Sequence, residues 1–232
     1  MPSVTTQLSD SKIRLILAAE KNFAEHGIEG ASLREISLAA GHGNTAAVQY
    51  HFKTKEVLAY AVFSYRVEQM EKPRGDMLAI AEEQGLLSDP RTLLEMLWLP
   101  HLELVDDRGR HSYAGFLIQY LLRNEPMGMP FVGNAPVNRT HNLAISKNLR
   151  RINKLLEERI AWLPPELATS RIMLCSLAFL NMLVRWDNRP ASSERSHESF
   201  MKLVADTIEI ATAALCAPAP RTSSFLLRHN GG

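Results

Sequence analysis

Residues 32–55 constrain the fold more than any other stretch, because they have the pattern of two short helices joined by a glycine turn. Ser32 and Glu35 form the S-x-x-E pattern of a helix start, in which each side chain caps a backbone N–H of the other residue. Gly41 is placed to end that helix, since glycine adopts the left-handed conformation without a Cβ penalty. Asn44 is a favourable N-cap for the next helix. The stretch therefore predicts a helix-turn-helix, a motif whose second helix lies in the major groove of DNA.

The sequence around this motif resembles the N-terminal domain of the tetracycline-repressor (TetR) family of transcription regulators. The resemblance covers residues 10–62 and is carried by the runs ILAAEKNFAEHGIEGASLREISLAAG and YHFKTKEVL. The matching positions are Ala18, Phe23, Gly27, Ser32, Ile36, Ala39, Gly41, Tyr50, His51, Phe52, Lys55 and Leu58. One difference is the turn from Gly41 to Gly43, which is one residue longer than the family usually has.

The rest of the chain has the apolar spacing of helices, and no alternation typical of strands persists. We expect an all-α fold of about nine or ten helices, over about residues 9–26, 32–41, 45–51, 54–73, 73–85, 89–102, 110–124, 137–162, 166–186 and 196–216. Pro73 should kink or break the fourth helix, and Pro100 should kink the helix that begins at Asp89-Pro90. The predicted domains are 1–53, a three-helix DNA-binding domain, and 54–216, an effector-binding and dimerisation domain. A tail at 217–232 is expected to be disordered.

The resemblance implies a ligand-responsive repressor that binds a pseudo-palindromic operator in double-stranded DNA as a homodimer. Counting back from His51, Val48 takes an inward position and Gln49 faces outward. Glutamine can read adenine edges bidentately, and tyrosine and histidine can donate to phosphate oxygens. By resemblance Lys55 contacts a phosphate, while Ser32 serves mainly as a cap. The candidate DNA contacts are Ser32, Arg34, Asn44, Thr45, Ala46, Ala47, Gln49, Tyr50, His51 and Lys55.

The last two predicted helices have the apolar surfaces expected of a dimer interface. Residues 172–184 are apolar on nearly every face, which is typical of a helix covered both by its own core and by a partner. The final helix carries an apolar stripe from Phe200 to Ala214. The family dimerises through these helices, and a twofold operator needs a twofold protein. The alternative interpretation is an ordinary monomer core.

The middle helices are expected, by resemblance, to enclose a pocket for a small and apolar effector. The candidate ligand contacts are Trp98, His101, Phe116, Tyr120, Arg123, Met127 and Phe131. Among them His101 and Arg123 are the polar anchors. The competing interpretation is that aromatic and methionine side chains at helical spacing simply fill the core.

Other classes of protein find little support in the sequence. We find no catalytic constellation, phosphate-binding glycine loop or metal-ligand spacing, so no enzyme, cofactor or metal site is expected. Cys175 and Cys216 are interpreted as reduced thiols of a cytosolic protein, and the longest apolar run is too short to span a membrane. The net charge of +1 does not by itself indicate a nucleic-acid partner. Two rivals therefore stay open: a TetR-like ligand- or partner-binding protein that does not read DNA, and a helical enzyme.

Overall fold

A computed structural model describes residues 8–123, 147–190 and 196–219. Within these ranges the chain forms nine α-helices and one 3-10 helix and contains no strand, which confirms the predicted all-α class. The elements are α1 (Asp10–Gly30), α2 (Leu33–Ala39), α3 (Ala46–Phe52), α4 (Lys55–Glu83), α5 (Pro90–Trp98), η1 (Leu99–Glu103), α6 (Ser112–Arg123), α8 (Lys147–Arg159), α9 (Pro165–Asp187) and α10 (His197–Leu215).

Some expectations fall outside the described residues. They are the beginning of the predicted helix over 137–162, the candidate ligand contacts Met127 and Phe131, and most of the predicted tail. The described part of that predicted helix is α8.

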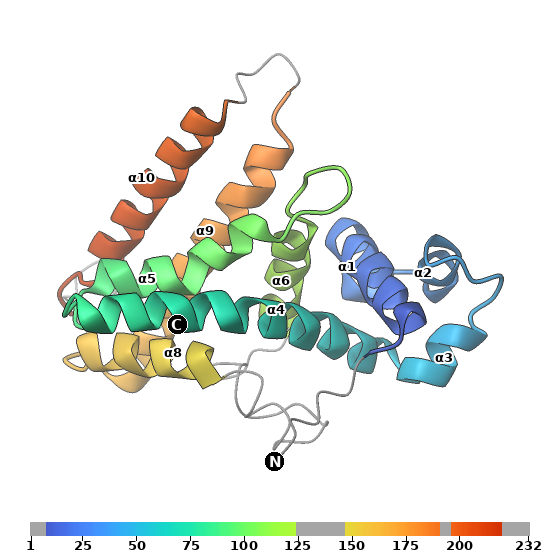
Figure 1. Cartoon of the computed structure of the whole chain (residues 1–232), viewed down its shortest axis with the longest axis horizontal. Helices are drawn as coiled ribbons and strands as arrows, with labels where there is room; N and C mark the ends of the chain where they lie inside the picture. Colours follow the sequence, from blue (N-terminus) through green and yellow to red (C-terminus); the bar gives the residue numbers. More distant parts are fainter. Residues whose placement is uncertain (1–7, 124–146, 191–195, 220–232) are drawn as a thin grey trace, which may run out of the picture.

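The helices form a small three-helix end and a larger helical body, joined by one long helix (Figure 1). Helices α1, α2 and α3 lie together at one end of the molecule. Helix α4 starts beside α3 and runs along the body, with α5 and α8 on either side of it. Helix α6 packs against both α1 and α9, and α9 pairs with α10 at the far side. A displacement of α4 would therefore change contacts both in the three-helix end and in the body.

Side-chain caps set most of the helix starts, as the sequence predicts. The side chain of Ser32 accepts a hydrogen bond from the Glu35 N–H (3.3 Å), and that of Thr54 accepts one from the first turn of α4. Asp89 caps α5 with Pro90 in its first turn, and Ser196 caps α10. Each cap satisfies an N–H that the helix itself leaves without a partner.

The expected reciprocal cap at Ser32 is built differently from the prediction. Glu35 does not reach the Ser32 N–H. Instead Asn22 of α1 accepts that hydrogen bond (3.1 Å) and donates its own amide to the Glu35 carboxylate (3.3 Å). The Asn22 side chain therefore bridges the two capping residues by hydrogen bonds and links α1 to the start of α2.

Two helix boundaries also differ from the sequence-based expectation. Pro73 does not divide the fourth helix, because α4 continues from Lys55 to Glu83. The hydrogen bond that proline removes is offset by packing, since Met70, Arg74 and Leu78 are buried on both sides of it. In α1 the backbone leaves helical geometry at Gly27 (φ 70°), as expected, but one further helical turn follows.

A buried charged network joins the small end of the molecule to its body. The carboxylate of Glu20 in α1 accepts hydrogen bonds from Arg66 Nε (2.6 Å) and Nη2 (2.8 Å) of α4. Ser112 of α6 donates to the same carboxylate (2.8 Å). Close approach of α1 and α6 is possible because Gly115 lacks a side chain: a Cβ there would lie 3.1 Å from that of Ala24. The Glu20 carboxylate thus links α1 of the three-helix end to both α4 and α6 of the body.

Candidate DNA interface and effector cavity

Helix α3 has one buried and one exposed face. Val48 and Phe52 point into the core, with 0% and 4% of their surfaces exposed. Gln49 is exposed on the opposite side, and Tyr50 exposes 82% of its surface although it is a large aromatic residue. Ala46 is also exposed and has a small side chain. This arrangement leaves a short polar and aromatic ridge free to contact another molecule, with Val48 inward as predicted.

The longer turn before α3 is well fixed. Gly41 adopts a left-handed φ of 81°, and the N–H of His42 donates to the Ser37 carbonyl oxygen (2.8 Å), which closes the end of α2. The imidazole of His42 hydrogen-bonds the Ser11 hydroxyl of α1 (3.2 Å). Thr45, rather than the predicted Asn44, is the N-cap residue of α3, and its side chain makes no capping hydrogen bond; the Asn44 side chain, one residue earlier, accepts from the Ala46 N–H (3.0 Å).

A very tight turn fixes α3 relative to α4. Lys53 has a φ of 62° and a ψ of −51°, and the Thr54 N–H donates to the Phe52 carbonyl oxygen at 2.6 Å. This is a γ-turn with positive φ, a strained conformation for a residue with a side chain. The turn is short, so only Lys53 and Thr54 separate the end of α3 from the first residue of α4.

Basic groups surround the exposed ridge of α3. Desolvation, followed by the nearby Lys12 and His42, holds the pKa of His51 below its usual value, so its imidazole is neutral at pH 7 and keeps one N–H to donate. The Nζ of Lys55 donates to the Glu29 carbonyl oxygen (2.7 Å), which leaves two of its protons for another acceptor. Lys12 was missed in the sequence, because it belongs to α1 and approaches α3 only in the fold.

The other candidate DNA contacts occupy the rim of this surface. Arg34 is exposed on α2, whereas Ser32 is half-buried and uses its hydroxyl as the cap of that helix. Thr45 and Ala47 are half-buried beside the exposed Ala46. Of these candidates, Arg34 and Ala46 are thus exposed, and Ser32, Thr45 and Ala47 are partly covered.

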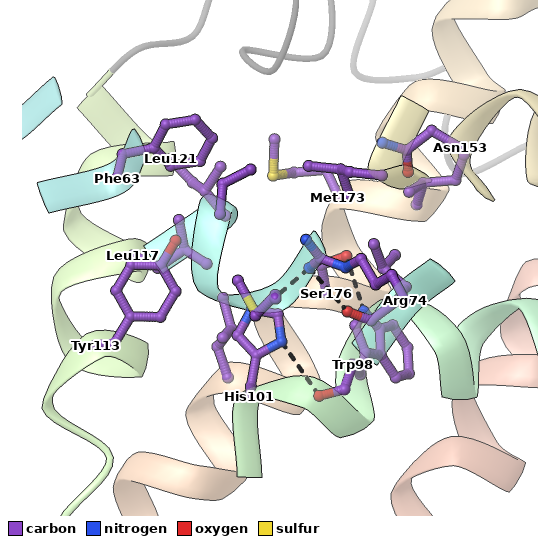
Figure 2. Close-up of a pocket in the computed structure, with 16 residues that line it drawn as sticks. Phe63, Arg74, Trp98, His101, Tyr113, Leu117, Leu121, Asn153, Met173 and Ser176 are labelled. Atoms are coloured by element: carbon purple, nitrogen blue, oxygen red, sulfur yellow. Dashed lines mark hydrogen bonds between the residues drawn. The ribbon is translucent and has the colours of Figure 1, made fainter. Parts of the chain in front are cut away.

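The body encloses a cavity between α4, α5, η1, α6, α8 and α9 (Figure 2). Its volume is about 30 Å³, and apolar side chains form most of its wall. Trp98 and His101 line it, as predicted. Burial, followed by the nearby Arg74 charge, lowers the pKa of His101 to about 3, so this imidazole is neutral. Its Nδ1 is hydrogen-bonded to the Trp98 carbonyl oxygen (3.1 Å).

The other predicted ligand contacts lie elsewhere. Phe116 and Tyr120 are buried and pack on one another, with ring centroids 5.5 Å apart, and neither lines the cavity. Arg123 lies at the end of α6, where its Nη2 pairs with Glu29 of α1 (2.7 Å) and Glu56 at the start of α4 (3.2 Å). As the competing interpretation holds, the two aromatic residues fill the core.

Sequence reasoning missed several polar side chains of the cavity wall, among them Arg74, Asn153 and Ser176. Arg74 of α4 and Asn153 of α8 both line the cavity and are both buried (Figure 2). Spacing offered a signal for Arg74: Met70, Arg74 and Leu78 follow one another at intervals of four residues, which places the arginine on the inward stripe of α4.

A groove with an apolar floor runs along the outer side of α9 and α10. Two of its large apolar side chains are mostly exposed, Leu174 (64%) and Ile210 (62%), and small residues such as Ala178 and Ala214 lie between them. Helix α9 is long and apolar enough to cross a membrane by length and composition, as core helices of soluble proteins also are. Its inner face packs against α6 and α10, so only the outer face lacks a cover among the described residues.

No metal centre is apparent in the described part of the chain, where no group of three or more His, Cys, Asp or Glu side chains could hold an ion. Cys175 and Cys216 are both free thiols, and desolvation raises the pKa of each. A raised pKa disfavours the reactive thiolate, so we interpret both cysteines as unreactive thiols that serve in packing.

The comparison with family models concerns the small three-helix end of the chain. The family model for bacterial regulatory proteins of the tetR family matches residues 15–62, which include all of α2 and α3. The HTH-type transcriptional repressor AcnR of Corynebacterium diphtheriae is 26% identical over 193 residues, which cover 69% of this chain and 97% of that protein. AcnR of Corynebacterium efficiens is 31% identical over 81 residues, covering 35% of this chain and 43% of that protein.

Solved structures with a similar arrangement also exist. One, from work on the control of antibiotic production by bacterial hormones, is 22% identical with a TM-score of 0.45, covering 92% of this chain and 98% of that one. Another is AibR in complex with isovaleryl coenzyme A and operator DNA, which is 16% identical with a TM-score of 0.44, covering 86% and 97%.

Proposed function

Because the chain belongs to the TetR family of DNA-binding transcriptional regulators, we propose that it is a repressor that binds a pseudo-palindromic operator as a homodimer and leaves it when a small molecule binds. The observation that carries the proposal is the outward face of α3. This short helix exposes Gln49 and Tyr50, while Val48 and Phe52 on its other face are buried. Helices of this kind enter the major groove and read base edges with such side chains.

A dimer would present two copies of α3 to one side of the duplex. The groove over α9 and α10 supports this arrangement, because its exposed apolar side chains need a cover. A twofold axis through it makes the surface self-complementary, as in most homodimers. Two reading helices about 34–36 Å apart would then fit successive major grooves.

Helix α4 supplies a physical route from the cavity to DNA. It begins at Lys55 beside α3, and its middle carries the cavity residues Phe63 and Met70. A ligand that favours a different position of α4 therefore changes the separation of the two α3 helices. By linkage it weakens operator binding only by its preference between the two conformers, and a preference of about 3 kcal/mol corresponds to roughly 150-fold.

The direct test is to sequence the genomic DNA fragments that the purified protein retains. A shared sequence with two inverted half-sites one helical turn apart is the expected result. Gel-shift assays on the recovered fragment then measure affinity. Retention of random fragments, or of none, would refute the proposed function and favour a protein of this fold that does not read DNA.

Gln49→Ala is expected to relax sequence preference at one base pair of each half-site. The exposed amide of Gln49 is the best-placed group for bidentate base contact, and its loss should cost about 1–3 kcal/mol at the cognate base. Affinities for a set of single-base operator variants measure this effect. Gln84→Ala, at an exposed glutamine past the far end of α4, is the matched control and should change nothing. Equal weakening on all operators would exclude Gln49 as the reading residue.

Lys55→Ala is expected to reduce the slope of log affinity against log salt concentration by about one. The reason is that Lys55 keeps two N–H groups for a phosphate beside its hydrogen bond to Glu29. Titration of the operator at several salt concentrations measures the slope. Lys72→Ala removes an exposed lysine from the same helix, where it pairs with Asp76, and should leave the slope unchanged. An unaltered slope in Lys55→Ala would place that side chain away from the phosphates.

A further inference from the structure

We propose that the effector is a small organic carboxylate, a singly charged acid with an apolar body, whose carboxylate pairs with Arg74 inside the cavity. The inference rests on the proposed function and adds to it the chemical class of the effector. It also departs from the expectation of a purely apolar effector.

Arg74 is a buried cation without an anion. Its side chain has 1% of its surface exposed. Its Nη2 donates to the Leu97 carbonyl oxygen (3.3 Å) and approaches the Met70 sulfur (3.5 Å). Its Nε and Nη1 have no hydrogen-bond partner among the described residues. Burial lowers the pKa of Arg74 to about 10, so the guanidinium is still charged at neutral pH. A charge held in this way is unfavourable unless something else neutralises it.

Arg66, a second buried arginine on α4, has the counter-ion that Arg74 lacks. Arg66 lies two turns earlier on α4 and is also buried, but it makes two short hydrogen bonds to the Glu20 carboxylate. The acid that acts on Arg74 electrostatically is Glu71. Its carboxylate is already engaged, because it accepts from the Asn148 N–H (2.8 Å) and the Leu149 N–H (3.1 Å) at the start of α8. The guanidinium of Arg74 therefore lacks the counter-ion that Arg66 has, and a bound carboxylate would supply it.

Asn153 provides a second polar group on the cavity wall. Both its Nδ2 and its Oδ1 are buried and have no hydrogen-bond partner in the described part of the chain. An amide N–H donor and a guanidinium with two free donors together match the acceptor pattern of a carboxylate. One unpaired cation also neutralises one negative charge, which favours a carboxylate over a doubly charged phosphate monoester.

The rest of the wall defines the body of the ligand. It is formed mainly by apolar side chains, among them Phe63, Val67, Leu117, Met173 and Leu180. The volume of about 30 Å³ holds only one or two water molecules, so the cavity must widen when an effector enters. The flexible side chains of Met70 and Met173 are suited to make way. Because Arg74 is on α4, this widening acts on the helix that carries α3.

Isothermal titration of the free protein tests the proposal. The probes are straight-chain monocarboxylates from acetate to decanoate, together with benzoate and phenylacetate, each compared with its primary amide; hexyl phosphate serves as the dianionic probe. We expect at least one acid to bind at least tenfold more tightly than its amide and than hexyl phosphate. Arg74→Met should lower the affinity for that acid at least tenfold and leave amide binding unchanged. Because this change removes an unpaired buried charge, the variant is expected to fold.

Two further variants make the result specific. Arg151→Met removes an exposed arginine of α8, where it pairs with Glu82, and should bind the acid as the natural protein does. Asn153→Leu should weaken acid binding about threefold or more. If no acid in the series binds, if acid and amide bind equally, or if Arg74→Met binds the acid undiminished, the proposal is overturned. Operator binding by the same preparation separates this failure from failure of the proposed function, because a protein that retains its operator but binds no acid refutes only the effector class.

Discussion

Replacing Glu20 with leucine is expected to lower the free energy of unfolding by about 3–5 kcal/mol, because it leaves the Arg66 charge buried without a partner. Glu20 and Arg66 expose 1% and 7% of their surfaces. Desolvation acts to lower the pKa of Arg66, but the hydrogen bonds and charge of Glu20 outweigh it and raise that pKa, which indicates how closely the two groups are coupled. The substitution also removes the acceptor of the Ser112 hydroxyl in α6.

The double substitution Glu20→Leu with Arg66→Met is the control for this prediction. Removing both charges leaves no unpaired ion in the core, and buried pairs replaced by apolar side chains often lose little stability. Urea unfolding followed by circular dichroism should therefore show the double variant to be more stable than Glu20→Leu alone. A double variant as unstable as the single one would show that packing, and not the ion pair, accounts for the loss.

Local signals made much of the fold predictable. Ser32 and Asp89 could be identified as helix starts because a cap acts within three residues of the chain. Gly41 could be placed for the same reason, since its left-handed backbone is a local requirement. Where tertiary neighbours decide, the sequence misleads: the predicted division of the helix at Pro73 was wrong, because α4 packs against the body and continues through Pro73.

The candidate site likewise contains residues that could be predicted from the sequence and residues that could not. The two faces of α3 follow from helical spacing, so the buried Val48 and the exposed Gln49 could be predicted from the sequence. For Arg74 the spacing with Met70 and Leu78 indicates only an inward position, and the polar run EKPRGD hides even that. Its lack of a counter-ion follows only from the packing of α5, α6 and α8 on α4. Phe116 shows the opposite error, since an aromatic residue in a central helix was assigned to the pocket although it packs between Phe23 and Tyr120.

Ile210→Asp is expected to raise the dissociation constant of the homodimer at least 100-fold, which corresponds to about 2.7 kcal/mol. Ile210 exposes 62% of its surface in the groove over α9 and α10, near the similarly exposed Leu174. A twofold interface repeats each substitution, so two carboxylates would be buried against apolar surface without partners. Sedimentation velocity over a range of protein concentrations measures the change in assembly.

Operator binding should fall together with dimerisation, because a single α3 has only half of the contacts that a twofold operator offers. Ile80→Asp is the matched control: Ile80 is an isoleucine of similar exposure (53%) on α4 and is not part of the groove. It should leave both the dimer and the operator affinity unchanged. If Ile210→Asp stays dimeric, the copies meet through another surface. If it becomes monomeric and still binds the full operator with undiminished affinity, the two α3 helices do not act together, and the proposed twofold recognition of DNA is excluded.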